Sequence, residues 1–233
     1  MTVVPAVQAH RGSPDPSEGV VENTLEAFLR ARRLGADSVE LDARLTADGG
    51  ICVHHDPVIE GAGPVHLLAT ADLPAHVPLL GDALEACAGM AINVEIKNLP
   101  PEPAFDPDEL AARAVVEMVL ETGRQDSVSI SSFWSGALAA VRATGAGIPT
   151  ALLVLPSFGV ADSVAAAVEL GCAGLNLPLG LVDMASVVAT RSAGLSVAAW
   201  TVADRAGLDA VLAAGVDTVI TDDVALARSV IDG

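Results

Sequence analysis

Acidic side chains follow two apolar runs of the sequence at a spacing that can bind a metal ion. Glu40 and Asp42 lie in the run VELD, and Glu95 lies in NVEIK, two residues before Lys97. Residues two apart in a strand point to the same face, so each pair shares one side of its strand. Three buried carboxylates that converge repel one another unless a cation lies between them. A hard divalent cation that prefers oxygen ligands, Mg²⁺ or Ca²⁺, fits this arrangement.

Two histidines accompany the carboxylates. His10 begins the triplet HRG after the first apolar run, and His55 belongs to HHD after the run Ile51–Val53. Imidazoles that flank a metal-bound phosphate can act as general acid and general base near neutral pH. We therefore expect His10 and His55 to form such a pair, whereas isolated histidines such as His66 and His76 are more often ordinary polar residues.

The same residues also fit other roles. Arg11, Lys97 and the carboxylates could form a structural ion-pair network, although their joint placement favours a functional site. Lys97 is the only lysine of the chain, and a lone lysine at a strand end could support a Schiff-base aldolase. Nearby carboxylates would keep it protonated, which argues against that chemistry. A non-catalytic phosphodiester-binding protein is a further alternative, which the presence of both histidines disfavours.

These residues lie at the ends of a repeated unit, which consists of a short apolar run, a loop and an Ala/Leu-rich helical segment. The expected strands are Val3–Ala9, Ser38–Asp42, Ala91–Lys97, Ser127–Ser132, Thr150–Val154, Gly174–Leu177, Ser196–Thr201 and Thr218–Thr221. The expected helices lie near residues 23–34, 80–88, 107–122, 135–144, 160–170, 181–193, 204–214 and 223–231. Such units close most naturally into a (β/α)8 TIM barrel, whose active site lies at the carboxyl ends of the strands. An open doubly wound sheet is the alternative, but no GxGxxG motif is present.

The length of 233 residues fits one barrel domain spanning residues 1–233. The segment Pro57–Leu79 is rich in Gly, Pro and His and fits neither the strand nor the helix period. We expect it to form a small inserted loop after the second strand, over the catalytic face.

Composition narrows the class of protein and its partners. Hydrophobic residues make up 52% of the chain, but no uninterrupted run of roughly 18 apolar residues predicts a membrane span. The start of the chain lacks a secretory signal pattern, and the odd number of three cysteines disfavours a disulfide framework. We therefore expect a cytoplasmic protein. Its net charge of -18 repels nucleic acid, so a phosphate ligand needs a locally positive site. The oligomeric state is not indicated.

Two further groups of residues map close to the expected site. Glu22 and Asn23 precede the first helix, where Asn23 or Thr24 would be an ordinary N-cap; we favour the capping role for Asn23. Aromatic residues at or just beyond strand ends could form an apolar rim around a phosphate site or plug the top of the barrel: Phe105, Phe133, Trp134, Phe158 and Trp200.

In their order and spacing, the motifs HRG, ENTLEAF, GADSVELDARLTADG, HHD and NVEIK resemble the glycerophosphodiester phosphodiesterase family. The resemblance continues through ISSF, GLNLP, AAWTV and GVDTVITD, so it covers nearly the whole chain. It implies a TIM-barrel enzyme that uses a divalent cation to cleave glycerophosphodiesters to sn-glycerol 3-phosphate and an alcohol. Attack by the glycerol 2-hydroxyl and hydrolysis of the cyclic phosphate are the implied steps.

The resemblance also assigns roles to residues. It implies that Glu40, Asp42 and Glu95 hold the cation and that His10 and His55 are the acid/base pair. Its implied substrate-binding side chains are Arg11 and Lys97 for the phosphate, with Glu22, Asn23, Asn176 and Trp200 around the substrate. Two departures are Val21, where the family usually has Pro, and a short insertion after His55. The second leaves substrate choice open, and lysophospholipase D-type activity on lysophospholipids is an alternative.

Overall fold

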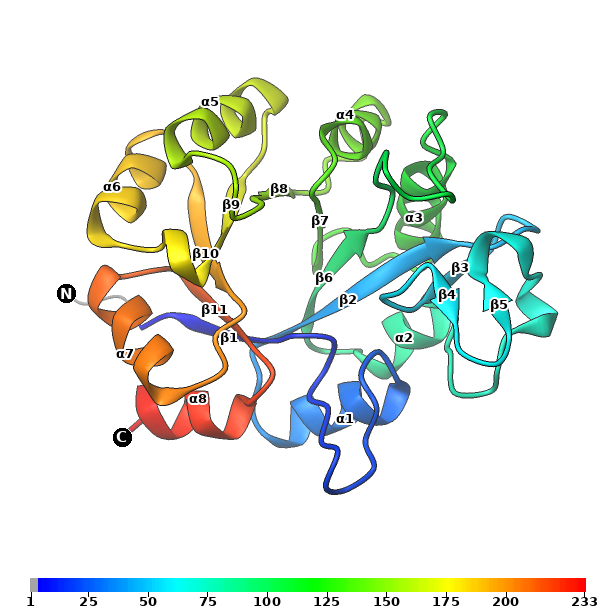
Figure 1. Cartoon of the computed structure of the whole chain (residues 1–233), viewed down its shortest axis with the longest axis horizontal. Helices are drawn as coiled ribbons and strands as arrows, with labels where there is room; N and C mark the ends of the chain where they lie inside the picture. Colours follow the sequence, from blue (N-terminus) through cyan, green and yellow to red (C-terminus); the bar gives the residue numbers. More distant parts are fainter. Residues whose placement is uncertain (1–3) are drawn as a thin grey trace.

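A closed parallel barrel forms the body of the protein in the computed structural model, which describes residues 4–233 (Figure 1). Val3, expected to begin the first strand, lies outside these residues. The barrel strands pair in the order β1-β11-β10-β9-β8-β7-β6-β2, and β2 also pairs with β1. This last pairing closes the ring and excludes the open sheet. The strands are β1 (Ala6–Ala9), β2 (Ser38–Leu45), β6 (Ala91–Ile96), β7 (Val128–Ser132), β8 (Thr150–Leu153), β9 (Gly174–Pro178), β10 (Ser196–Trp200) and β11 (Thr218–Thr221).

One α-helix follows each barrel strand and lies on the outside of the ring (Figure 1). Several begin later than the sequence predicts. For example, the third helix begins at Leu110 because Glu109 has a left-handed φ of 55° and cannot extend it. The helices are α1 (Leu25–Arg33), α2 (Leu80–Ala86), α3 (Leu110–Glu121), α4 (Ser135–Ala143), α5 (Val160–Leu170), α6 (Met184–Ser192), α7 (Arg205–Ala214) and α8 (Val224–Ile231). The fold is thus the expected (β/α)8 barrel.

Strand alternation divides the side chains of β2 between two environments. Val39 and Leu41 are fully buried in the hydrophobic core between strands and helices. Glu40 and Asp42 alternate with them, and Asp42 is the register partner of Glu95 on β6. The packing that buries the apolar residues therefore turns the acidic ones toward the barrel lumen.

The inserted segment has more order than a plain loop. β3 (Ile51–Val53) runs antiparallel to the end of β2, and β4 (Val58–Ile59) pairs with β5 (Gly63–Pro64). Two short 3₁₀ turns follow, Val65–Leu67 and Thr70–Asp72. A separate small core is formed by Cys52, Ile59, Val65 and Val77. This core stabilises the segment next to the carboxyl ends of the strands.

Residues 4–233 include eight α-helices. None of the helices there is long and apolar enough to span a bilayer. All three cysteines are free and buried.

Candidate active site

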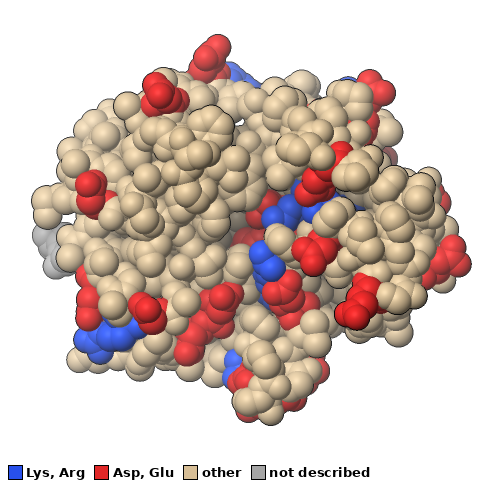
Figure 2. Space-filling model, viewed as in Figure 1, with Lys and Arg blue, Asp and Glu red and all other residues tan. Residues whose placement is uncertain are grey.

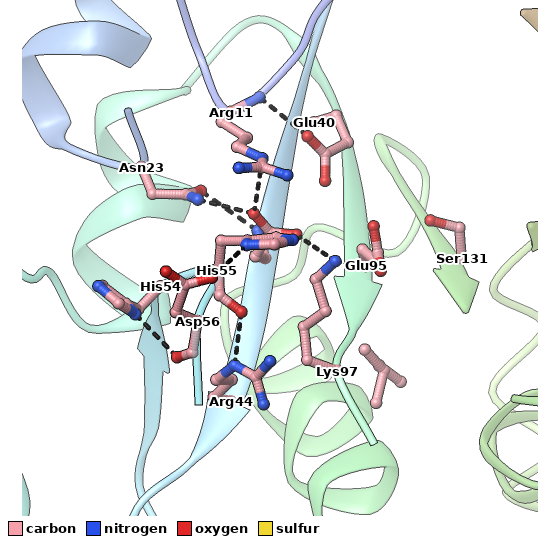
Figure 3. Close-up of polar contacts among 12 residues, drawn as sticks. Arg11, Asn23, Glu40, Arg44, His54, His55, Asp56, Glu95, Lys97 and Ser131 are labelled. Atoms are coloured by element: carbon pink, nitrogen blue, oxygen red, sulfur yellow. Dashed lines mark hydrogen bonds and ion pairs between the residues drawn. The ribbon is translucent and has the colours of Figure 1, made fainter. Parts of the chain in front are cut away.

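The three carboxylates predicted as metal ligands meet in the barrel lumen. One oxygen each from Glu40, Asp42 and Glu95 lies within 4.8 Å of the others. Their relative exposures are 3%, 0% and 6%. Figure 2 shows acidic and basic side chains gathered in a central hollow of this face, and Figure 3 shows the residues around it. The cluster is therefore buried, acidic and open to the hollow only at its top.

Burial and mutual repulsion change the acidity of this cluster. Burial raises the pKa of Glu40 to about 8, and the charge of Asp42 adds to that rise. Burial likewise raises the pKa of Glu95 to about 7. For Asp42 burial acts in the same direction, but the charges of Lys97 and Arg11 outweigh it and hold the pKa of Asp42 below its usual value. Without a cation, the cluster holds protons near neutral pH.

The oxygen atoms of the cluster lack the partners that buried carboxylates normally have. Oε1 of Glu40 accepts no hydrogen bond from the described residues, and Oδ1 of Asp42 and Oε1 of Glu95 have only the ammonium of Lys97 within ion-pair distance. Buried charged oxygens without hydrogen bonds are costly, and each of these faces the others. The donor set is all oxygen and anionic, which is the chemistry that Mg²⁺ and Ca²⁺ prefer. The residues present therefore fit a hard divalent cation.

Lys97 brings positive charge to the same place. Its Nζ lies 2.5 Å from Oε1 of Glu95 and 3.0 Å from Oδ1 of Asp42. It also lies 5.8 Å from the centre of the Phe133 ring. Burial lowers the pKa of Lys97, but Glu95 and Asp42 outweigh this effect and raise it. The ammonium therefore stays charged, which disfavours a Schiff base and leaves a cation for binding phosphate.

Arg11 is held on the opposite side of the cluster by a strained turn. Its φ is 52°, and its backbone N–H donates to Oε2 of Glu40 at 2.8 Å. Its side chain donates to Glu22 at 2.9 Å and has Nε 3.3 Å from Asp42. Gly12 follows with a φ of 82°, and a Cβ there would lie 2.8 Å from the backbone of α1. Only glycine therefore lets the HRG turn pack so closely against the helix.

Asn23 has a different role from the one expected. The N-cap of α1 is Thr24, whose hydroxyl accepts from the backbone N–H of Ala27, so the prediction that Asn23 caps the helix is wrong. Asn23 has a φ of 56°, which turns its amide into the barrel, where it donates to Oδ2 of Asp42 at 2.7 Å. Its backbone N–H donates to the carbonyl of Arg11 at 2.9 Å. These hydrogen bonds orient the carboxylate of Asp42.

Each candidate catalytic histidine is paired with a carboxylate that the sequence analysis did not identify. Nδ1 of His10 lies 2.7 Å from Asp222, and Nδ1 of His55 lies 2.7 Å from Asp56. Nε2 of His10 lies 4.0 Å from Glu40. Sequence position alone could have indicated both carboxylates, because Asp222 directly follows the last strand and Asp56 directly follows His55.

The two imidazoles have opposite pKa shifts. Burial lowers the pKa of His10, but the hydrogen bond to Asp222 and the charge of Glu40 outweigh it and raise this pKa. The pKa of His55 is lowered by burial and then by the charge of Lys97. The pocket therefore contains one imidazole that favours holding a proton and one that favours releasing it.

Arg44 at the end of β2 was also missed. Its side chain is only 5% exposed and forms two bonds with the Glu102 carboxylate, at 2.7 and 3.2 Å. Its Nε donates to the backbone carbonyl of His55 at 2.8 Å. Because Glu102 lies in the loop after β6, one arginine joins that loop to the histidine segment.

A cavity of about 120 Å³ contains most of the predicted site. Phe133 and Leu153 add apolar walls, and the rings of Phe133 and Trp200 meet edge to face at 5.5 Å. The predicted residues that line this cavity are His10, Arg11, Glu40, His55, Glu95, Lys97 and Trp200.

Two predicted side chains are placed elsewhere. Asn176 lines a separate cavity of about 160 Å³ near the amino ends of the strands. It lies one layer below Trp200, because Trp200 pairs with Pro178 while Asn176 pairs with Ala198. Glu22 pairs with Arg11 and lines a neighbouring cavity rather than the carboxylate pocket.

Only some of the aromatic residues predicted near the strand ends lie beside the carboxylate cavity. Phe133 and Trp200 border the carboxylate cavity. Phe105 and Trp134 instead pack on each other at 5.7 Å, and the Trp134 indole donates to Glu109. Phe158 is 57% exposed. A continuous aromatic rim is therefore wrong, and two of the five residues form an apolar wall.

Comparison with known proteins shows similarity along nearly the whole chain. The glycerophosphoryl diester phosphodiesterase family model matches residues 10–226. A glycerophosphodiester phosphodiesterase of Caldanaerobacter subterraneus subsp. tengcongensis is 27% identical, over 93% of each chain. An Oleispira antarctica phosphodiesterase, solved in complex with the product sn-glycerol-3-phosphate, is 28% identical with a TM-score of 0.86, over 99% of this chain and 98% of the other.

A Thermotoga maritima glycerophosphodiester phosphodiesterase is 25% identical with a TM-score of 0.80, over 99% of both chains. The family match covers the histidines, the carboxylate cluster and every barrel strand after β1. This chain therefore belongs to the glycerophosphoryl diester phosphodiesterase family and is a phosphodiesterase.

Proposed function

We propose that the enzyme hydrolyses glycerophosphodiesters to sn-glycerol 3-phosphate and an alcohol, with the help of a divalent cation. The observation that carries this proposal is the set of three buried carboxylates whose oxygens lie within 4.8 Å of one another, beside a cavity lined by two histidines. The product bound to the Oleispira antarctica relative supports the choice of product. A small phosphodiester also suits a cavity of about 120 Å³.

Glu40, Asp42 and Glu95 would hold Mg²⁺ or Ca²⁺. When bound, such a cation neutralises phosphoryl oxygens and lowers the pKa of a nearby hydroxyl. Arg11 and Lys97 supply the remaining positive charge and orient the phosphate. Trp200 and Phe133 pack against the carbon atoms of the glycerol.

The histidines divide the proton transfers. His55, whose lowered pKa keeps it neutral, accepts the proton of the glycerol 2-hydroxyl as its oxygen attacks phosphorus. His10, whose raised pKa keeps it protonated, donates a proton to the departing alcohol. The roles then reverse: His10 accepts a proton from the water that opens the cyclic phosphate, and His55 returns its proton to the 2-oxygen. Both histidines end the cycle in their starting states. Asp222 and Asp56 keep each ring oriented by binding Nδ1.

Incubation with glycerophosphocholine and Mg²⁺ or Ca²⁺, followed by an enzymatic assay for sn-glycerol 3-phosphate, tests the reaction. We expect product with the cation and none in excess EDTA, with activity restored when the cation is returned. Absence of product from every glycerophosphodiester tried, or full activity in EDTA, would refute the proposal.

Neighbouring residues offer matched control variants. His55→Gln should lower kcat by about 10²-fold or more, because it removes the proton acceptor of the first step. His54→Gln alters the adjacent histidine, which does not line the carboxylate cavity, and should stay close to the wild-type rate. Equal losses in both variants would indicate a structural rather than a catalytic role for His55.

A further inference from the structure

A second cavity lies inside the barrel, at the end opposite the catalytic hollow. It has a volume of about 160 Å³, and its lining includes the first residues of four strands: Thr150 of β8, Gly174 of β9, Ser196 of β10 and Thr218 of β11. Among the described residues, Asn93 alone lines both this cavity and the catalytic one. We call this space the lower lumen.

The lower lumen is hollow because small and polar side chains occupy its walls. In most (β/α)8 barrels, bulky branched residues from alternate strands fill this space in layers. The strand residues that line it here are Gln8, Asn93, Ser129, Thr150, Ala151, Gly174, Asn176, Ser196, Val197, Ala198 and Thr218. Most of them are smaller than the usual leucine or isoleucine, so the space stays open.

The lining is uncharged but rich in hydrogen-bonding groups. No Asp, Glu, Lys, Arg or His is among the described residues that form it. Asn176 is only 6% exposed; its backbone carbonyl accepts from the Trp200 indole, whereas its side-chain amide bonds to no other described residue. Gln8 donates through Nε2 to Ser38 at 2.9 Å, which leaves its Oε1 to accept. Buried donors and acceptors therefore face the cavity, and such groups normally have partners.

The ligand that suits these walls is small, neutral and polar. A charged molecule would lose its hydration without gaining a counter-charge, and an apolar one would leave the Asn176 amide unsatisfied. Hydroxyl groups both donate and accept, so they can match amides and hydroxyls on every wall. The volume equals the share of about five water molecules in the liquid. It admits a molecule such as glycerol, because covalently bonded atoms lie closer together than separate waters.

We propose that the lower lumen is a binding site for a small neutral polyol of about the size of glycerol, distinct from the catalytic site. Pro149, Ala173 and Ser196 line the cavity and are exposed, so they form its mouth on the amino face of the barrel. Gln8 and Asn176 are buried and form its inner end. Because the catalytic cavity lies at the other face, the two sites can be occupied together. The proposal does not rest on the proposed function.

A titration of the ¹⁵N-labelled protein with glycerol, followed by NMR, tests the site. We expect the amide shifts of Ser129, Gly174 and Ser196 to change and then to saturate as the glycerol concentration rises. Exclusion of a cosolvent from the whole surface would instead give changes that grow without saturation and spread over the chain. Glycerate has a similar size but a negative charge, so its affinity at these amides should be lower by about tenfold or more.

Two variants change the site in different ways. Asn176→Leu roughly keeps the side-chain volume but removes the amide, so the affinity for glycerol should fall by about tenfold or more. Ala173→Trp narrows the mouth at an exposed position and should abolish the saturable change. Ala143→Trp is the matched control, since Ala143 is exposed at the end of α4 and does not line the cavity. It should bind glycerol as the wild type does.

Several outcomes would overturn the proposal. Shifts that never saturate would show that the lower lumen holds water only. Saturable shifts confined to Phe133 and Thr201 would place glycerol in the catalytic cavity, which these two residues line. Binding that persists unchanged in Ala173→Trp, or glycerate that binds as tightly as glycerol at these amides, would contradict the site or its preference for neutral ligands. The amide spectrum of each variant outside the cavity verifies that it is folded.

Discussion

At each histidine of the pocket, a carboxylate holds Nδ1 and so determines which ring nitrogen is free for the substrate. Asp222 holds His10 and Asp56 holds His55, both at 2.7 Å. A carboxylate in this position also favours the protonated ring. The carboxylate thereby affects both the orientation of the imidazole and the pH range in which the imidazole transfers protons.

Asp222→Asn should therefore lower kcat by about 10²-fold. Because Asp222 raises the pKa of His10, its loss should move the limb of the kcat/KM pH profile that reports His10 to lower pH. Asp223→Asn is the matched control: Asp223 caps α8, and because Asn caps a helix as well as Asp does, that variant should keep its stability and its pH profile. An unchanged profile in Asp222→Asn would contradict the positioning role.

The carboxylate cluster links metal binding to stability. In the folded protein the pKa of Glu40 is about 8, against an ordinary value of 4.5, so folding takes up protons between these values. The free energy of unfolding without metal should therefore fall as pH rises through this window. Cations compete with the protons, so their stabilising effect should grow with pH.

Thermal unfolding in EDTA, scanned from pH about 5 to about 8, checks this expectation. The melting temperature should fall toward the upper end, and added Mg²⁺ or Ca²⁺ should raise it most there. In Glu40→Gln the fall should be smaller and the cation should stabilise less. A melting temperature in EDTA that rises across the window would contradict the buried, protonated cluster.

At the scale of the element, β2 carries much of the site because it is longer than its neighbours in the barrel. Its inward residues contribute two carboxylates, and its extension supplies Arg44 and the pairing with β3. Arg44 then binds the carbonyl of His55 and the carboxylate of Glu102. One strand thus places two of the three proposed metal ligands and fixes the segment that holds a proposed acid/base residue.

Arg44→Met should lower kcat/KM by roughly tenfold by freeing the His55 segment, and should reduce stability by roughly 3 kcal/mol because it strands Glu102. Arg44→Lys should recover little, since an ammonium cannot form the planar double contact. Arg205→Met breaks an exposed pair with Asp209 and should change stability by less than about 1 kcal/mol. Full activity in Arg44→Met would remove the positioning role.

At the scale of the whole molecule, the protein and its proposed substrate carry charge of the same sign. The net charge is -18, yet the proposed substrate carries a phosphodiester anion. Arg11 and Lys97 provide local positive charge at the centre of the face, beside the acidic cluster (Figure 2). The long-range field still opposes the approach of any ligand with a net negative charge.

This conflict predicts a substrate-dependent salt effect. For glycerophosphoglycerol, which has a net negative charge, kcat/KM should rise between low salt and about 0.15 M because the repulsion is screened. For glycerophosphocholine, which is zwitterionic, it should change much less. Steady-state rates at constant divalent cation concentration make the comparison. A parallel response of the two substrates would show that the net charge does not influence encounter.

Local pattern alone establishes the barrel and most of its active face. Periods of two and 3.6 residues, which neighbouring residues impose, predict three features: the eight repeats, the shared strand face of Glu40 and Asp42, and the position of His10 after a strand. These periods require only the chain within a few residues of each position. They therefore also predicted that an inserted segment follows the second strand.

Tertiary structure decided what distant residues do to one another. Asp222 reaches His10 across 212 positions of sequence only because β11 pairs with β1 when the barrel closes. Asn23 turned to Asp42 instead of capping α1, and the layer of Asn176 was set by strand register. Such contacts depend on which strands meet and at what register, and that follows from packing the whole ring rather than from any local run of residues.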